Sequence, residues 1–377
     1  MPSTVGVSEE RKPYHLLQID LLKGLAIIFV IILHSLPFNE VRIYTFSVFY
    51  VWQALPIFVA ILALNQGMSF SRKKITTFNG LYSAKYVLNR VRRLVYPFLL
   101  IFFATLAVWI TIDYYFLKVV SANLLGGLVI RVFSYFFVAN WFVPFVFVFI
   151  LIFPALYWLY LSNPKAVLVA SFAVSLAAFL LELAIPELMY SSTLSAYLWR
   201  YAILRYLFLI VLGIWIIKDQ TISSDRNKWI IRGACMSVVY LFALNVLFIL
   251  ILRAGAPPNI NLLTSATQNC FTFFYTILLL LIGINYLPKV KKGLLSQTIS
   301  FFGRASWHIF LFQAVYIHTV FYAAIIFLRY SFNVEQSFVL ATIINVLICC
   351  FFGSLFFLLD AKFLDFSFVK SRFKKTF

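Results

Sequence analysis

Long apolar runs separated by short polar stretches form the dominant pattern of this chain. A helix needs about 20 apolar residues to cross a bilayer, and about ten of the runs approach this length. Because the bilayer core offers the backbone no hydrogen-bond partners, such runs fold as helices. The pattern therefore predicts an all-α polytopic membrane protein with about ten transmembrane helices. The expected spans are 21–38, 44–66, 95–117, 139–161, 166–185, 199–217, 229–252, 268–287, 306–328 and 337–359.

Basic and apolar residues mix at near-helical spacing in 83–93, within the longest polar insertion, 70–94. This mixture is typical of an amphipathic helix at the membrane surface, and we expect one on the inner face. Pro97 then falls in the first turn of the next span, where its missing N–H costs little.

The composition agrees with a membrane protein, since 63% of the residues are hydrophobic, 11% are charged and the mean hydropathy is +0.97. The net charge of +19 is compatible with nucleic-acid binding, but most of the 31 Lys and Arg residues lie between alternate spans. This bias is the positive-inside rule, so it predicts that both termini are cytoplasmic and that the protein lies in the plasma or inner membrane. We expect no nucleic-acid partner.

The whole chain, 1–377, is expected to form a single membrane domain, with a cytoplasmic leader at 1–19 and a basic cytoplasmic tail at 360–377. No cleavable signal peptide is evident. The tail is able to contact anionic lipid headgroups. The four cysteines lie within expected spans without metal-ligand spacing, so no metal site is predicted (Cys235, Cys270, Cys349 and Cys350).

The first span carries the most informative polar residues, Asp20, Lys23 and His34. Eleven helical steps bring Lys23 and His34 to one face, about 16 Å apart along the axis. Ionisable groups inside a membrane helix are costly and commonly mark a functional site. The alternative is that Lys23 snorkels at the helix end and His34 packs against another helix.

Arg90 and Arg93 form a second cluster, one helical turn apart, and two guanidinium groups in this arrangement suit one phosphate. The alternative is a solvated basic face that serves only the positive-inside rule. Because they are expected on the same side as Lys23, the three cations together suit a ligand with several phosphates.

Other ionisable residues fall inside or at the ends of expected spans. His308 and His318 are rival buried histidines, although packing is the commoner role for each. Glu182 and Asp113, near outer helix ends, are candidates to orient a histidine or to bind substrate. A pairing of Arg205 with Glu182 is the structural alternative, because buried charges need partners.

Six motifs along the chain resemble those of the integral-membrane acyltransferase-3 family. They occur in the family's order, over roughly residues 15–360. Lys23 replaces the commoner arginine, and Gln313 stands where histidine is usual, so no catalytic role is carried over to Gln313. The motifs are Asp20 with Lys23-Gly24 and His34, Trp52 to Phe58, Arg90 and Arg93 before Pro97, Trp141 to Pro144, Arg205 to Gly213, and Phe302 to Leu311.

The resemblance implies a membrane O-acyltransferase, most simply an O-acetyltransferase, that moves an acyl group from cytoplasmic acyl-coenzyme A to a hydroxyl of a cell-envelope glycan or lipid-linked sugar. Lys23, Arg90 and Arg93 would hold the coenzyme phosphates. His34 would deprotonate the acceptor or carry the acyl group, with Asp20 in support. Further candidates are Glu182 for catalysis, and Trp141, Arg205 and His308 for substrate binding.

A transporter or flippase for lipid-linked saccharides is the alternative function, with the intramembrane charges lining its pathway. The two halves show no evident repeat and no span is broken by paired Gly and Pro, which argues against it. The acceptor, the acyl chain length and the oligomeric state, for which a homodimer is one option, are not specified by the sequence.

Overall fold

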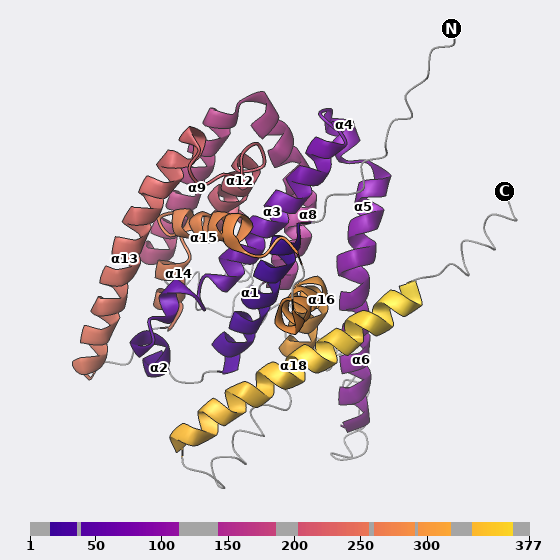
Figure 1. The fold of residues 1–377 in the computed structure, drawn as a ribbon, viewed down its shortest axis with the longest axis vertical. Coiled ribbons are helices and arrows are strands. Elements are labelled where there is room, and N and C mark those ends of the chain that lie inside the picture. Colours follow the sequence, from indigo (N-terminus) through magenta and orange to yellow (C-terminus); the bar gives the residue numbers. More distant parts are fainter. Residues whose placement is uncertain are drawn as a thin grey trace, which may run out of the picture.

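The computed structural model describes residues 16–35, 39–112, 142–185, 203–255, 260–290, 293–317 and 334–364. These residues form helices joined by short connections, and the described ranges contain no strand (Figure 1). Seven helices in them are long and apolar enough to cross a membrane. The predicted all-α polytopic fold is therefore confirmed.

Each expected span corresponds to one helix of the structure. Two of these helices, α12 and α15, are shorter than a bilayer needs, and α16 starts at Leu294 rather than at 306. The helices are α1 (Leu17–Ser35), α3 (Ala54–Arg72), α6 (Tyr96–Ile112), α8 (Phe142–Ser162), α9 (Pro164–Ala184), α12 (Leu207–Trp215), α13 (Lys228–Arg253), α15 (Phe273–Tyr286), α16 (Leu294–Tyr316) and α18 (Val334–Leu364).

Short helical segments connect the long helices. The expected span 44–66 begins with irregular turns, and its regular helix starts only at Ala54. The short segments are α2 (Asn39–Tyr44), η1 (Ser47–Phe49), α4 (Phe78–Leu81), α5 (Ala84–Arg90), η2 (Val91–Val95), η4 (Ile203–Tyr206), η5 (Asp225–Asn227) and α14 (Ile260–Thr267).

The helix expected near 83–93 is present as α5 and η2, and it continues directly into α6. Ser83 caps α5 by accepting a hydrogen bond from the Tyr86 N–H, and α5 then continues through the π-helical segment η2 into α6. Figure 1 shows α5 and α6 along one line. Pro97 explains the π turn, because it cannot donate to the Arg93 carbonyl as an α-helix requires. Tyr96 N–H pairs with the Val91 carbonyl, five residues back, and not with the Arg92 carbonyl as in an α-helix.

α1 and α16 cross at very short distance. A Cβ at Gly24 would collide with the Ile299 carbonyl, and one at Gly303 would collide with the Asp20 carbonyl, so only glycine permits this approach. Farther along, His34 of α1 meets Gln313 of α16, so the two helices run in the same direction. This agrees with their expected places as the first and ninth spans.

α18 packs antiparallel against this pair of helices. Its Asn345 donates a hydrogen bond to Ser35 at the end of α1, at 2.9 Å, whereas its Asp360 pairs with His308 of α16. The helix continues to Leu364, beyond the end of the expected span at 359.

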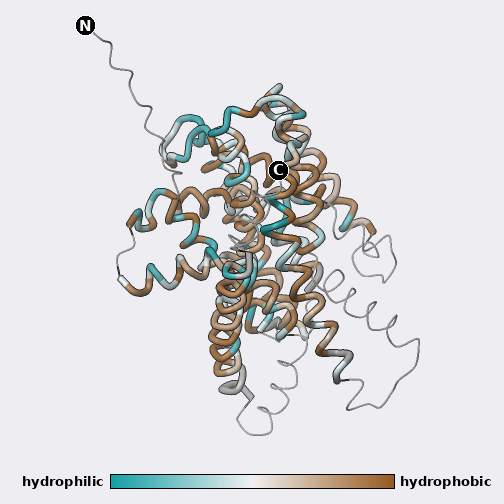
Figure 2. The backbone as a smooth tube through the Cα atoms, turned by 90° about the vertical axis from the view of Figure 1, so that its right-hand side faces the viewer, coloured by the Kyte–Doolittle hydropathy of each residue, from teal (hydrophilic) through white to brown (hydrophobic). Residues whose placement is uncertain are grey.

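Polar connections gather at one end of the helices. Gln220, between α12 and η5, contacts Met68 of α3 and accepts a hydrogen bond from Asn285 of α15 at 2.7 Å. Arg226 of η5 donates to Tyr160 of α8. Figure 2 shows hydrophilic stretches at this upper end and hydrophobic residues over most of the helix length. This end, the basic end, carries the connections for which the sequence predicts an inner position.

Candidate active site

His34 lies in the last turn of α1 and is exposed, although its neighbours Leu33 and Ser35 are buried. Its Nδ1 is 2.5 Å from Nε2 of Gln313, whose own side chain is only 2% exposed. An exposed imidazole that contacts a buried amide is suited to proton transfer with a bound molecule. Gln313 received no role from the sequence, where only its place directly after the motif Phe302 to Leu311 pointed to it.

The end of α1 beside His34 is held from two sides. Arg42 of α2 donates from Nη2 to the Leu33 carbonyl at 2.6 Å, which satisfies one of the carbonyls left without a helical partner. Ser35 donates to the Ile31 carbonyl and accepts from Asn345 of α18. These contacts fix the backbone that carries the imidazole.

The other end of α1 carries the expected pair of Asp20 and Lys23. Lys23 Nζ lies 3.2 Å from Asp20 Oδ1, and the carboxylate is buried whereas the lysine side chain is 22% exposed. The two side chains form an ion pair, and the role of Asp20 in orienting Lys23 for a ligand stays a prediction.

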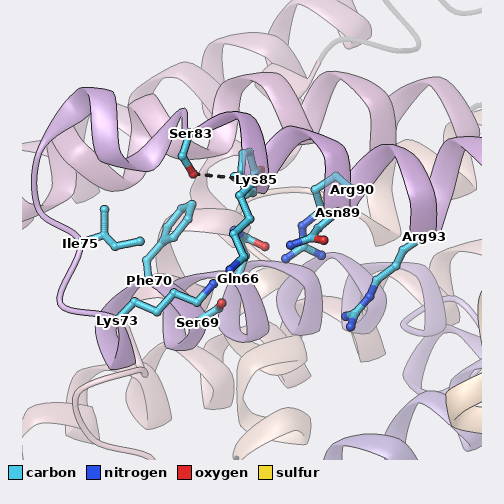
Figure 3. A pocket seen from close by; sticks show the side chains of 11 residues that line it. Gln66, Ser69, Phe70, Lys73, Ile75, Ser83, Lys85, Asn89, Arg90 and Arg93 are labelled. Carbon is cyan, nitrogen blue, oxygen red and sulfur yellow. Dashed lines mark hydrogen bonds between the residues drawn. The ribbon is translucent and has the colours of Figure 1, made fainter. Parts of the chain in front are cut away.

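A cavity of about 300 Å³ opens between α3 and the α5–η2 segment at the basic end (Figure 3). Arg90 and Arg93 line it, as the phosphate-site prediction requires, whereas Lys23 is not among its lining residues. Lys73 and Lys85 also line it, although neither was a candidate from the sequence. The only sequence feature that pointed to them was their position in the basic stretch 70–94. The lining residues are Gln66, Ser69, Phe70, Lys73, Ile75, Ser83, Lys85, Tyr86, Asn89, Arg90 and Arg93.

The cavity is electrostatically prepared for an anion. Among the described residues its lining has four cations and no carboxylate, so the like charges repel until an anion binds. In Figure 3 the side chains of Lys73, Lys85 and Arg90 extend into the space between the two helices. Gln66 adds a buried Oε1 without a hydrogen-bond partner. We call this cavity the cationic pocket.

Two aromatic residues fix the wall that carries the arginines. Tyr86 donates from its hydroxyl to the Ile150 carbonyl of α8 at 3.0 Å, and the Arg90 guanidinium lies 5.7 Å from the Tyr86 ring. Trp307 of α16 donates from Nε1 to the Leu94 carbonyl at 3.1 Å. Gln313 follows Trp307 by six positions, about 9 Å along α16. One helix therefore connects the wall of the cationic pocket with the His34 contact.

Glu182 and Arg205 pair with each other. Arg205 Nη1 lies 3.6 Å from Glu182 Oε1, and the guanidinium also donates to the carbonyls of Gln268 and Thr264 at 2.9 and 3.1 Å. The structural alternative considered for these two residues is thus present in the fold.

His308 is buried, with its Nε2 2.8 Å from Asp360 Oδ2 and with the rings of Phe356 and Phe357 edge-on to the imidazole. The pair joins α16 to α18. Asp360 was not among the candidates from the sequence, because it lies just beyond the expected span 337–359.

Three sequence candidates, Trp141, His318 and Asp113, lie outside the described residues. Within the ranges that the structure describes, no group of three or more His, Cys, Asp or Glu side chains is arranged to hold a metal ion.

Comparison with known protein families identifies one match. The family model described as the acyltransferase domain of the acyltransferase-3 family matches residues 16–359, nearly the whole chain. No curated protein and no solved structure matches the chain. The match covers α1, the cationic pocket and almost all of α18. The chain therefore belongs to the acyltransferase-3 family and is a multi-pass membrane acyltransferase.

Proposed function

We propose that this protein is an O-acyltransferase that moves an acyl group, most simply acetyl, from cytoplasmic acyl-coenzyme A to a hydroxyl of a cell-envelope glycan or lipid-linked sugar. One observation carries the proposal. One helix, α16, contacts both the segment that carries the pocket arginines, through Trp307 and Leu94, and His34, through Gln313, in a chain of the acyltransferase-3 family.

The donor half of the proposal rests on the chemistry of the cationic pocket. Coenzyme A carries a diphosphate and a ribose phosphate, and guanidinium forks bind such groups through paired hydrogen bonds. Arg90 and Arg93 would bind one phosphate group, and Lys73 and Lys85 would neutralise the other. The positive-inside rule supports a cytoplasmic position for this end, on the side where acyl-coenzyme A is available.

The reacting half rests on His34. The acceptor O–H bond breaks as its proton passes to the imidazole, and the oxygen attacks the thioester carbonyl. The new C–O bond forms, the C–S bond breaks, and the departing sulfur takes the proton back. A positioned base of this kind contributes about 10²–10⁴-fold to the rate. An acyl-histidine formed on His34 is the other route to the same products.

The proposed acceptor is supported by the exposure of His34 and by the family resemblance. His34 is exposed at the end of α1 remote from Lys23, so an acceptor approaches it without crossing the cationic pocket. The hydroxyl of a glycan or lipid-linked sugar is the acceptor that the family resemblance favours.

The test uses the full-length protein in lipid vesicles, with acetyl-coenzyme A labelled in its acetyl group and with extracted lipid-linked sugars as acceptors. We expect label in the sugar fraction, with transfer reduced at least 100-fold by His34→Ala. Arg92→Ala is the matched control, because Arg92 is exposed in η2 but does not line the cationic pocket. Movement of the sugars across the bilayer without any acetyl transfer would instead establish the flippase alternative.

A further inference from the structure

The contact between Gln313 and His34 joins a buried amide to an exposed imidazole. Gln313 is 2% exposed, and its Oε1 is buried without a hydrogen-bond partner, whereas its Nε2 lies against Nδ1 of His34. A buried polar side chain within the apolar part of a membrane helix is costly. Because a leucine at this position would avoid that free-energy cost, we infer that the amide of Gln313 has a function.

The amide is able to match either neutral tautomer of the imidazole. Its N–H donates to Nδ1 when that nitrogen is bare, and its carbonyl oxygen accepts when Nδ1 carries the proton. A half-turn of the amide exchanges these two arrangements at the same contact. Only the second arrangement leaves Nε2 bare, so a base at Nε2 requires Oε1 of Gln313 to accept a hydrogen bond from Nδ1–H.

The amide differs from a carboxylate in a way that matters for a base. A carboxylate beside a histidine stabilises the imidazolium by its charge, whereas a glutamine orients the ring without adding charge. His308 of the same helix has the opposite arrangement, because it faces Asp360. α16 therefore carries one histidine–carboxylate contact and one histidine–amide contact.

The position of Gln313 is fixed on both sides of the helix. Gly303 holds α16 against the Asp20 carbonyl of α1, and Trp307 holds it to the Leu94 carbonyl. The end of α1 is fixed in turn by Arg42. The amide and the imidazole therefore meet between two constrained backbones, as a positioning role requires.

We propose that Gln313 is a positioning residue that holds the His34 ring by accepting a hydrogen bond from Nδ1–H through Oε1 and so directs Nε2 to the acceptor hydroxyl. This inference rests on the proposed function, since it assigns the base nitrogen of the same transfer. It gives Gln313 a role in catalysis that requires no contact with substrate.

The first test compares pH profiles of acetyl transfer by the full-length protein in vesicles. Gln313→Met, which keeps the length and removes the amide, should lower kcat by 10- to 100-fold and leave the KM for acetyl-coenzyme A unchanged, because the cationic pocket is remote. Gln313→Glu should recover part of kcat. The acid limb of the pH profile of kcat for Gln313→Glu should move by about one pH unit or more to higher pH. The reason is that the carboxylate stabilises the protonated His34 imidazole, which is inactive as a base. Gln297→Met, on the exposed first turns of α16, is the control.

The second test needs no measurement of activity. The chain has only four histidines, so labelling with ¹⁵N-histidine gives few side-chain signals, and His34→Ala identifies that of His34. We expect one neutral tautomer in the wild-type protein, and a mixture of tautomers in Gln313→Met. The positioning role is overturned if His34 of the wild-type protein already exchanges between tautomers. It is also overturned if Gln313→Met has an unchanged kcat and an unchanged acid limb of its pH profile. Absence of acetyl transfer in the wild type, with the single tautomer present, overturns the proposed function instead.

Discussion

Replacing Arg90 with alanine removes one of the four cations of the cationic pocket and should weaken the binding of coenzyme A by roughly 10- to 100-fold. The magnitude follows from burial. A hydrogen bond to a charged group is worth about 1.5–3 kcal/mol, and 1.4 kcal/mol corresponds to tenfold in affinity. Arg90 is partly buried against the Tyr86 ring, so solvent screens it less than an exposed cation.

Arg93 allows an internal comparison. It lines the same pocket but is exposed, so Arg93→Ala should cost about 0.2–1 kcal/mol, or up to roughly fivefold in affinity. Arg92→Ala should change almost nothing, because Arg92 does not line the pocket. The three variants remove the same charge from neighbouring positions, so they separate direct contact from a general loss of positive charge.

The assay is titration calorimetry of coenzyme A into the purified full-length protein at two ionic strengths. The affinity of wild type should fall as salt increases, and the loss caused by Arg90→Ala should persist at high salt because the group is partly buried. Equal weakening by Arg90→Ala and Arg92→Ala would refute the reasoning, since it would show that only the overall charge of the basic end matters.

Three further predictions concern the packing around the site. Gly303→Ala should lower the thermal stability in a melting experiment by about 1–3 kcal/mol, because its methyl group pushes α16 from α1; an unchanged melting temperature would contradict the close crossing. His308→Ala should lower the free energy of unfolding by about 1–3 kcal/mol, since it leaves the Asp360 carboxylate buried and unpaired. A His308→Ala protein with unchanged stability and lowered affinity for coenzyme A would instead assign His308 to coenzyme binding. Arg205→Ala should destabilise more than the double replacement of Arg205 and Glu182, because the double variant leaves no buried charge unpaired; a stable but inactive Glu182→Gln would make Glu182 catalytic.

The helices and one half of the site were predictable because local sequence determines them. Hydrophobic runs locate the ten helices, since the bilayer requires each run to satisfy its own backbone. Arg90 and Arg93 were predictable as a pair because one turn of a helix separates them. The position of Pro97 at the start of a span was also predictable. The π turn that joins α5 to α6 was not, because it depends on hydrogen bonds that residue spacing does not show.

The remaining features depend on contacts between distant segments. Gln313 reaches His34 only because Gly24 and Gly303 let α1 and α16 approach, and no local pattern shows which helices will meet. The same holds for Asp360: a charged residue near the end of an apolar run indicates the end of a span, and its contact with His308 joins positions that are 52 residues apart.

The central claim is that this chain acylates an envelope sugar through His34, and mass spectrometry of envelope glycans and lipid-linked sugars tests it most directly. Cells that lack the gene would be compared with cells that carry the wild-type gene, His34→Ala or Arg92→Ala. We predict that one acyl modification, a mass increase of one acetyl group in the simplest case, is present with wild type and Arg92→Ala and absent without the gene or with His34→Ala. The same modification at full level in cells producing His34→Ala would contradict the account.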